Sequence, residues 1–230
     1  MRKFIIDKEI FKNIPNLSVG VVIVDGIDNS KPIELAEEFS AISEAIKAKF
    51  GGVELSEYPV IRGWRDVYKS FGEKKNRSSI EALIRRIING KEIPNINPLV
   101  NIYNLISLKY EMPCGGEDLA FVDSDIELTY SKGDEIFVPL GTEEREFPNL
   151  GEIIYKAGTN VICRSFNYRE SDLTKLTEKT KSAIIVIENL QADKECLNKA
   201  LNELATLVND SLGGISKIVI LDERCNSIEL

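Results

Sequence analysis

Asparagine side chains recur in a short segment that ends in two glycines. Asn97, Asn101 and Asn104 are spaced by four and by three residues, so on a helix they would share one face. Amide groups both donate and accept hydrogen bonds, which suits the binding of a small polar ligand. Gly115-Gly116 predicts a sharp turn after that helix. The segment therefore predicts one wall of a pocket, with helix capping and a buried turn as the structural alternative.

A second group of polar side chains follows a predicted strand that ends at Cys163. Arg164 and Asn167 stand close together there, and a guanidinium beside an amide can clamp a carboxylate, a carbonyl or a phosphate. Phe166 and Tyr168 could stack on a base, although we expect both to pack in the core. This segment therefore predicts a second wall of a binding site.

Glu188 ends the apolar segment 183–187. A carboxylate costs free energy at such a place unless it lies at a sheet edge or has a partner. We expect Glu188 to line a pocket; otherwise it is the polar end of a strand.

Positive charge is densest at Lys74, Lys75 and Arg77, just before a predicted helix that carries Arg85 and Arg86. The N-terminus of a helix favours an anion. We therefore expect Arg77, Arg85 and Arg86 to contact phosphate groups, with a solvated basic loop as the alternative.

The chain contains no histidine, which excludes a Ser-His-Asp or a Cys-His mechanism within one chain. Its four cysteines are widely spaced and form no Cys-x-x-Cys pair. We expect reduced, mostly buried thiols, and neither a metal site nor a cofactor.

The balance of 29 basic against 37 acidic residues gives a net charge of −8. This charge argues against a protein that coats nucleic acid with its whole surface, but it leaves room for a local basic face. No run of 18 apolar residues predicts a membrane span, and the N-terminal residues lack the apolar core of a secretory signal. We expect a cytoplasmic protein without a membrane partner.

Hydrophobic periodicity predicts a single α+β unit over residues 1–230, without repeats or linkers. Helices are expected at 32–50, 64–71, 80–89, 98–111 and 193–212. Strands are expected at 17–24, 126–130, 135–139, 151–155, 160–163, 182–188 and 215–221, with hairpins over 126–139 and 151–163 and a tail at 222–230.

The pattern Asn-Pro-Leu-Val-x-x-Tyr-Asn-x-x-Ser-Leu-x-Tyr-x-x-Pro-x-Gly-Gly-x-Asp over residues 97–118 resembles the B3/B4 domain. Residues 76–86 and the Cys-Arg-x-x-Asn-x-Arg segment at 163–169 resemble the same family, and the likeness covers about residues 55–190. The resemblance implies a B3/B4-like mixed sheet with flanking helices.

The family pattern also has a glutamate and a threonine where this chain has Glu188 and Thr180, and Asp118 stands at a matching position. The chain departs from the pattern at Gly115, where the synthetase domain has a histidine, and at Asn101, where relatives usually carry an acid. These departures concern the specificity of a pocket rather than its presence.

In bacterial phenylalanyl-tRNA synthetase the B3/B4 domain hydrolyses mischarged tyrosyl-tRNA. The resemblance implies a tRNA-interacting protein that hydrolyses mischarged aminoacyl-tRNA in trans, using ordered water and the terminal hydroxyl of the tRNA. Its partner would be the aminoacylated 3′ end of tRNA, and no DNA is expected. The implied substrate-binding residues are Asn97, Asn101, Asn104, Arg164, Asn167 and Glu188, with Gly115, Gly116 and Asn104 positioning water.

Two other functions are compatible with the same residues. One is a non-catalytic module that binds RNA or a free amino acid, and the other is an interaction protein that keeps only the fold. The acidic charge favours these alternatives, whereas the arginines favour the hydrolase. The amino acid, the tRNA and the oligomeric state stay open.

Overall fold

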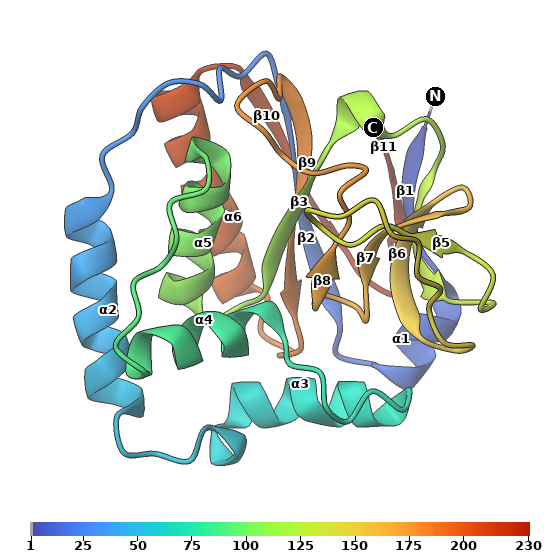
Figure 1. Cartoon of the computed structure of the whole chain (residues 1–230), viewed down its shortest axis with the longest axis horizontal. Coiled ribbons are helices and arrows are strands. Elements are labelled where there is room, and N and C mark those ends of the chain that lie inside the picture. Colours follow the sequence, from blue (N-terminus) through green and yellow to red (C-terminus); the bar gives the residue numbers. More distant parts are fainter. Residues whose placement is uncertain (1) are drawn as a thin grey trace.

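The computed structural model describes residues 2–230 and arranges them as two β-sheets with helices along their outer side (Figure 1). The larger sheet has the strand order β11-β1-β4-β6-β7-β5, with β8 beside β7. Its strands are β1 (Lys3–Ile6), β4 (Ile126–Tyr130), β5 (Ile136–Phe137), β6 (Ile153–Ala157), β7 (Asn160–Arg164), β8 (Arg169–Glu170) and β11 (Ser227–Glu229).

The smaller sheet has the order β10-β2-β9-β3 and is antiparallel throughout. Its strands are β2 (Ser18–Asp25), β3 (Cys114–Asp118), β9 (Ser182–Asn189) and β10 (Ile215–Leu221). In the larger sheet, β1 pairs with β4 and β5 with β7 in parallel, whereas the other pairs are antiparallel. The expected α+β fold with a mixed sheet and flanking helices is therefore confirmed.

Helices α5 and α6 pack against each other and cover one face of the smaller sheet, with α2 outside α5 (Figure 1). Helix α3 runs along one end of both sheets (Figure 1). The helices are α1 (Lys8–Asn13), α2 (Ala36–Phe50), α3 (Pro59–Ser70), α4 (Ser79–Ile88), α5 (Pro98–Tyr110) and α6 (Glu195–Leu212), with short 3₁₀ turns η1 (Leu55–Glu57) and η2 (Leu119–Phe121).

Strand β2 supplies both layers of the core because its side chains alternate between the two faces of the sheet. Val22 and Val24 pack toward α5 and α6, whereas Val19 and Val21 pack toward the larger sheet. A Cβ atom on Gly20 would lie 2.7 Å from the side chain of Leu201, so glycine there lets α6 approach the strand closely.

The expected hairpin over 126–139 is wrong, although the one over 151–163 is confirmed as β6 and β7. Both edges of β4 are already taken, by β1 and by β6. The chain therefore passes on to the far edge of the sheet, where β5 pairs with β7.

The helix expected at 64–71 begins earlier, at Pro59, and two further expectations differ from the structure. Residues 227–229 of the expected tail form β11, which pairs with β1. Gly115-Gly116 forms no turn, because both glycines lie inside β3 and pair with β9. Helix α5 instead ends at Glu111, which takes the left-handed conformation at φ 56°.

Candidate functional site

The two sheets face each other across a small cavity, and strand register decides which side chains reach it. In β9, Glu188 shares a face with Ile184 and Val186, because alternate residues of a strand point to the same side. In β3, Glu117 lies opposite Ile184 and Gly115 opposite Val186. The smaller sheet therefore presents two glutamates and a glycine toward the cavity.

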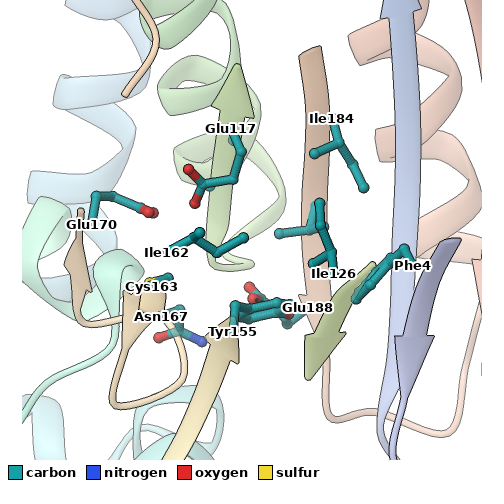
Figure 2. Close-up of a pocket in the computed structure, with 13 residues that line it drawn as sticks. Phe4, Glu117, Ile126, Tyr155, Ile162, Cys163, Asn167, Glu170, Ile184 and Glu188 are labelled. Atoms are coloured by element: carbon teal, nitrogen blue, oxygen red, sulfur yellow. Dashed lines mark hydrogen bonds between the residues drawn. The ribbon is translucent and has the colours of Figure 1, made fainter. Parts of the chain in front are cut away.

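The larger sheet closes the cavity from the other side. Tyr155 of β6 pairs with Cys163 of β7, and Cys163 pairs with Glu170 of β8, so the three side chains form one row. Phe4, Ile126 and the other lining residues add apolar surface (Figure 2). The result is a mainly apolar chamber with a few convergent polar groups, which is typical of a ligand site.

A wider pocket lies next to this inner cavity. The space open to the centre of a water molecule is about 20 Å³ in the inner cavity and about 620 Å³ in the outer pocket. Gly116, Glu117 and Glu170 line both spaces. The inner cavity has room for one or two water molecules, whereas the body of a larger ligand fits only the outer pocket.

Glu188 is 1% exposed and only half of its carboxyl group is paired. The Tyr155 hydroxyl donates to Oε1 at 2.9 Å, and Oε2 has no hydrogen-bond partner. Burial raises the pKa of Glu188 to about 8, with the charge of Glu170 adding to the rise and the Tyr155 hydroxyl opposing it. At neutral pH the group is therefore mostly a neutral carboxylic acid with one oxygen available in the cavity.

Asn167 is the second partly unpaired polar group of the inner cavity. It is 7% exposed; its Oδ1 accepts a hydrogen bond from the Tyr68 hydroxyl at 2.9 Å, and its Nδ2 has no partner. The side chain lies at the same end of the cavity as Tyr155 and Glu188 (Figure 2). Burial raises the pKa of Glu188, and hydrogen bonding from the Asn167 amide opposes that rise, so the two groups lie close together. Nδ2 and Oε2 nevertheless have no well-formed hydrogen bond among residues 2–230 and can hold a water molecule or a ligand between them.

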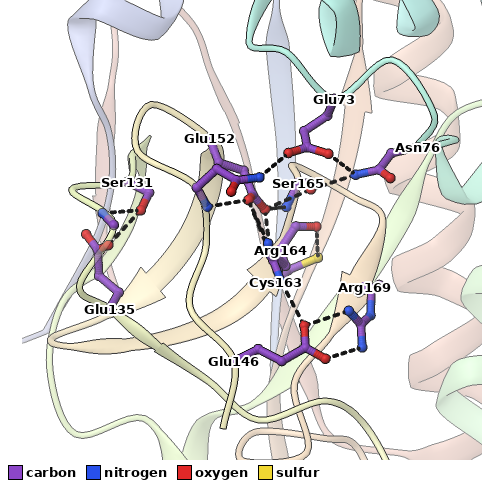
Figure 3. Close-up of polar contacts among 12 residues, drawn as sticks. Glu73, Asn76, Ser131, Glu135, Glu146, Glu152, Cys163, Arg164, Ser165 and Arg169 are labelled. Atoms are coloured by element: carbon purple, nitrogen blue, oxygen red, sulfur yellow. Dashed lines mark hydrogen bonds and ion pairs between the residues drawn. The ribbon is translucent and has the colours of Figure 1, made fainter.

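The loop that carries Asn167 is held by Glu152, which is fully buried (Figure 3). Glu152 accepts hydrogen bonds from the Ser165 backbone N–H at 2.9 Å, the Ser165 hydroxyl at 2.8 Å and Arg164 Nε at 3.0 Å. These contacts stabilise the left-handed conformations of Ser165 (φ 49°) and Phe166 (φ 62°). Arg164 thus acts in this structure through the loop rather than by reaching the cavity.

The guanidinium groups of this segment are also paired on their outer side. Glu146 accepts from Arg164 Nη1 at 2.7 Å and from both Nη atoms of Arg169, at 2.9 and 3.1 Å (Figure 3). The arginines lower the pKa of Glu146, chiefly through the Arg169 hydrogen bond. Neither Arg164 nor Arg169 lines the inner cavity, so substrate binding by Arg164 stays an untested prediction.

Glu117 and Glu170 point toward one another at the border between the two spaces (Figure 2). Burial raises the pKa of both carboxyl groups, and the charge of Glu170 raises that of Glu117 further. Thr174 donates its hydroxyl to Glu117, and Oε2 of Glu170 has no partner. A Cβ atom on Gly115 would lie 2.8 Å from Glu170 Oε1, so the glycine makes room for this carboxyl group.

The thiols beside the cavity are unsuited to nucleophilic attack. Burial raises the pKa of both Cys114 and Cys163 well above its usual value, so each stays protonated at neutral pH. All four cysteines are unpaired thiols, but only Cys114 and Cys163 are buried.

The three asparagines do not form a common binding face, which corrects the expectation for this helix. Asn97 is the N-cap of α5, and its amide contacts Asn29 and the Leu176 carbonyl oxygen. Asn101 lines a different groove, near α2, and Asn104 is not among the residues that line either the inner cavity or the outer pocket. Asn97 caps the helix and also lines the outer pocket, so substrate binding by Asn97, Asn101 and Asn104 stays an untested prediction.

The predicted phosphate-binding arginines are also engaged within the protein. Glu81, fully buried, accepts from Arg65 Nη2 at 2.7 Å and from Arg85 Nε at 2.8 Å, while Arg77 Nε lies 3.6 Å away. Burial opposes ionisation of Glu81, but the arginine contacts win and its pKa is lowered. Arg86 donates to the backbone oxygen of Glu92. Contact with RNA stays an untested prediction for Arg77, Arg85 and Arg86.

Three further expectations concern residues near the cavity. Asp118 caps η2 by accepting from the Ala120 N–H at 3.0 Å, and it accepts from the Thr180 hydroxyl at 2.7 Å. Phe166 packs in the core against Trp64, as expected. The expectation of core packing is wrong for Tyr168, which is 44% exposed because it follows the left-handed turn.

Sequence reasoning missed Glu117, Glu170 and Tyr155 as cavity residues. One signal for Glu117 was available: it stands two residues after Gly115, so in a strand the two share a face. The row Tyr155-Cys163-Glu170 depends on the register of three strands, which local sequence patterns do not encode.

Within residues 2–230, no group of three or more Cys, Asp or Glu side chains is arranged to hold a metal ion. Over the same residues, no helix has both the length and the apolar character needed to cross a lipid bilayer.

Comparison with known proteins shows the family to which the chain belongs. The chain is similar to an N-terminal fragment of the phenylalanyl-tRNA synthetase β subunit from Pyrococcus horikoshii, with 15% identity and a TM-score of 0.47. The match covers 94% of this chain and 52% of the fragment, so the chain spans about half the length of that protein. Among curated proteins no sequence matches. The model of the B3/4 domain matches residues 63–213, from α3 to the end of α6, and the chain therefore belongs to the B3/4 domain family.

Proposed function

We propose that this chain binds the aminoacylated 3′ end of a tRNA and hydrolyses the ester of a mischarged amino acid. The observation that carries the proposal is the inner cavity, where Glu188 and Asn167 each keep one buried polar atom without a partner. Buried polar groups in native proteins are nearly always paired, so two exceptions in one cavity favour a site that acts on a ligand.

The sizes of the two spaces suggest how the ligand would be divided between them. The aminoacyl ester would occupy the outer pocket, because the inner cavity has room only for water. Lys175 and Lys179 line the outer pocket; Lys175 pairs with Asp172, and Lys179 is exposed. This position supports Lys179 as the contact to a phosphate near the 3′ end of the RNA.

The chemistry asked of the protein is modest because an aminoacyl ester is already activated. The oxygen of a water molecule bonds to the acyl carbon, the ester C–O bond breaks, and the ribose oxygen leaves with a proton. Glu188 and Asn167 would position that water, which is a proximity effect. Because Glu188 is mostly protonated at neutral pH, it would act as a hydrogen-bonding group rather than as a charged base.

One observation favours a second function, the binding of a free amino acid without hydrolysis. Of the arginines expected to contact RNA, Arg85 pairs with the buried Glu81, Arg77 lies 3.6 Å from the same carboxyl group, and Arg86 donates to the Glu92 backbone. A module whose candidate RNA-binding arginines are engaged within the protein suits a small ligand better than a polyanion.

The test is the loss of ester from a panel of mischarged tRNAs. We expect Glu188→Ala to slow turnover of the preferred substrate at least tenfold and Glu188→Gln to retain most of it, since glutamine can also donate a hydrogen bond into the cavity. Glu143→Gln, at an exposed residue that lines neither space, is the matched control. No ester loss from any tRNA of the panel would exclude the hydrolase.

The RNA contact has its own measurement, the dependence of tRNA binding on salt. Lys179→Ala should lower affinity and reduce the slope of log K against log salt by about one, as expected for one lost phosphate contact. Lys199→Ala, on the exposed side of α6, should change neither. Equal effects of the two variants would place the RNA elsewhere.

A further inference from the structure

The border between the inner cavity and the outer pocket is made of two acids without a basic partner. Glu117 and Glu170 line both spaces, and their carboxyl groups point toward one another (Figure 2). Within residues 2–230, neither carboxyl group takes part in an ion pair. Burial raises the pKa of both carboxyl groups, and each acts on the other through hydrogen bonding, so a shared proton can hold the pair together. Keeping two acids side by side without a cation still costs free energy.

The sequence makes room for this arrangement at Gly115. Any side chain there would place its Cβ atom 2.8 Å from Glu170 Oε1. The Thr174 hydroxyl donates to Glu117 Oε2, which orients that carboxyl group. The pair is thus held at the border, and Oε2 of Glu170 keeps its capacity to accept a hydrogen bond.

The cavity beyond the pair supports a ligand site independently. Glu188 and Asn167 are 1% and 7% exposed, and each has one polar atom without a partner in that cavity. No lysine or arginine lines the inner cavity. A ligand that reaches the border from the outer pocket therefore meets two carboxyl groups that can accept hydrogen bonds, and a cation bound there would lower their raised pKa values and so favour their charged form.

We propose that Glu117 and Glu170 together bind a primary ammonium group, and that in the substrate this group is the α-ammonium of the aminoacyl ester. The inference deepens the proposed function and rests on it for the identity of the ligand. An ammonium group offers three donors to carboxylate oxygens and needs no fixed coordination geometry. A divalent metal ion is a poorer fit, because it requires six or more oxygen ligands and no such group exists among residues 2–230.

The position of the pair would also give the site its chemical selectivity. With the α-ammonium held at the border, the neighbouring acyl carbon lies at the mouth of the inner cavity, next to the water that Glu188 and Asn167 would hold. An N-blocked aminoacyl group has no positive charge and would leave the acids unpaired. The site is therefore expected to accept aminoacyl groups with a free amine and to reject N-acylated ones.

The test compares amino-acid amides with their N-acetyl counterparts as probes. The twenty L-amino-acid amides carry the ammonium group and no carboxylate, so they imitate the ester end of the substrate. We expect calorimetry to detect binding of at least one amide, with affinity at least tenfold above that of its N-acetyl form. Glu170→Gln and Glu117→Gln should each reduce that affinity at least tenfold, whereas Glu143→Gln, at an exposed residue outside both spaces, should leave it unchanged.

Three results would overturn the proposal: no binding of any amide, equal binding of the N-acetyl form, or full affinity in both glutamine variants. Circular dichroism of each variant separates lost binding from lost folding, and Glu170→Gln is the variant expected to disturb the fold less, because Glu170 is only half-buried by surface area.

Assays on tRNA separate this inference from the proposed function. If N-acetyl-aminoacyl-tRNA is deacylated as fast as the free-amine form, the hydrolase stands and the ammonium site is excluded. If the amides bind through the pair and no tRNA is deacylated, the ammonium site stands and the hydrolase is excluded.

Discussion

Two regions of this protein bury glutamates in opposite ways. Glu81 and Glu152, both fully buried, are surrounded by arginines or by several donors. Glu188, equally buried, has one hydroxyl partner, and Glu117 and Glu170 have no cation. The first arrangement stabilises loops and helix ends, whereas the second leaves hydrogen-bonding capacity in a cavity. Pairing, rather than burial, therefore separates structural acids from candidate functional ones.

The largest expected effect comes from breaking a paired acid. Glu152→Ala removes the acceptor of Arg164 and of both donors of Ser165. It should lower the free energy of unfolding by about 3–5 kcal/mol, because the buried Ser165 donors and Arg164 Nε lose their acceptor while Glu146 still pairs only with the outer side of the guanidinium. Urea unfolding measures this, with the exposed Glu143→Ala as control. A loss below about 1 kcal/mol would show that the Arg164 cluster is not structural.

The buried Glu188 carboxyl group should make the free energy of unfolding depend on pH. Folding raises the pKa of Glu188 to about 8, so its contribution to stability is fully present below the unfolded pKa and is lost as pH rises through about 8. Between pH 6 and pH 8, the wild type should lose about 2 kcal/mol more unfolding free energy than Glu188→Gln does. The raised pKa values of Glu117 and Glu170 also make stability fall as pH rises, and they do so in the wild type and in Glu188→Gln alike. Parallel pH profiles in urea unfolding would contradict the assignment.

A smaller effect is expected at the glycine that makes room for the acid pair. Gly115→Ala should cost about 1 kcal/mol in stability, since the clash is with the end of a flexible side chain, and it should displace the Glu170 carboxyl group. Gly63→Ala is the control. Gly63 lies inside α3, and a Cβ atom there would lie 3.6 Å from the Leu190 side chain, which is an ordinary contact. Loss of amide binding in the first variant alone, measured by calorimetry, is the expected result.

The smallest effect should come from the most exposed arginine of the Glu81 cluster. Arg77 is 54% exposed and lies 3.6 Å from Glu81, so Arg77→Ala should change unfolding free energy by less than about 1 kcal/mol. Arg65→Ala should cost more, because Arg65 donates twice to the buried carboxylate. The reverse order of urea midpoints would show that the two arginines have been ranked wrongly.

The sequence predicted the parts of the molecule that depend on local patterns. The α5 helix, the apolar strand before Glu188 and the β6–β7 hairpin were expected, because periodicity and turn residues encode them. The pairing of β5 with β7 and the strand conformation of Gly115-Gly116 were not expected, because the partner of a strand depends on which strands of the sheet have a free edge.

The candidate site was predicted only in part for the same reason. Glu188 and Asn167 were expected to face a ligand, and both line the inner cavity, as do Gly115 and Gly116. Arg164 was expected beside Asn167, but it turns toward Glu146 and Glu152. No local pattern shows whether a guanidinium reaches a ligand or a neighbouring carboxylate; that depends on which acids the fold brings within reach.

The most direct test of the central claim is a crystal structure of the protein with the amino-acid amide that binds most tightly. The account predicts the ligand in the outer pocket, with its ammonium nitrogen within hydrogen-bond distance of Glu117 and Glu170 and the cavity of Glu188 beyond it. A ligand seated instead in the groove beside α2, or against the arginines around Glu81, would contradict it.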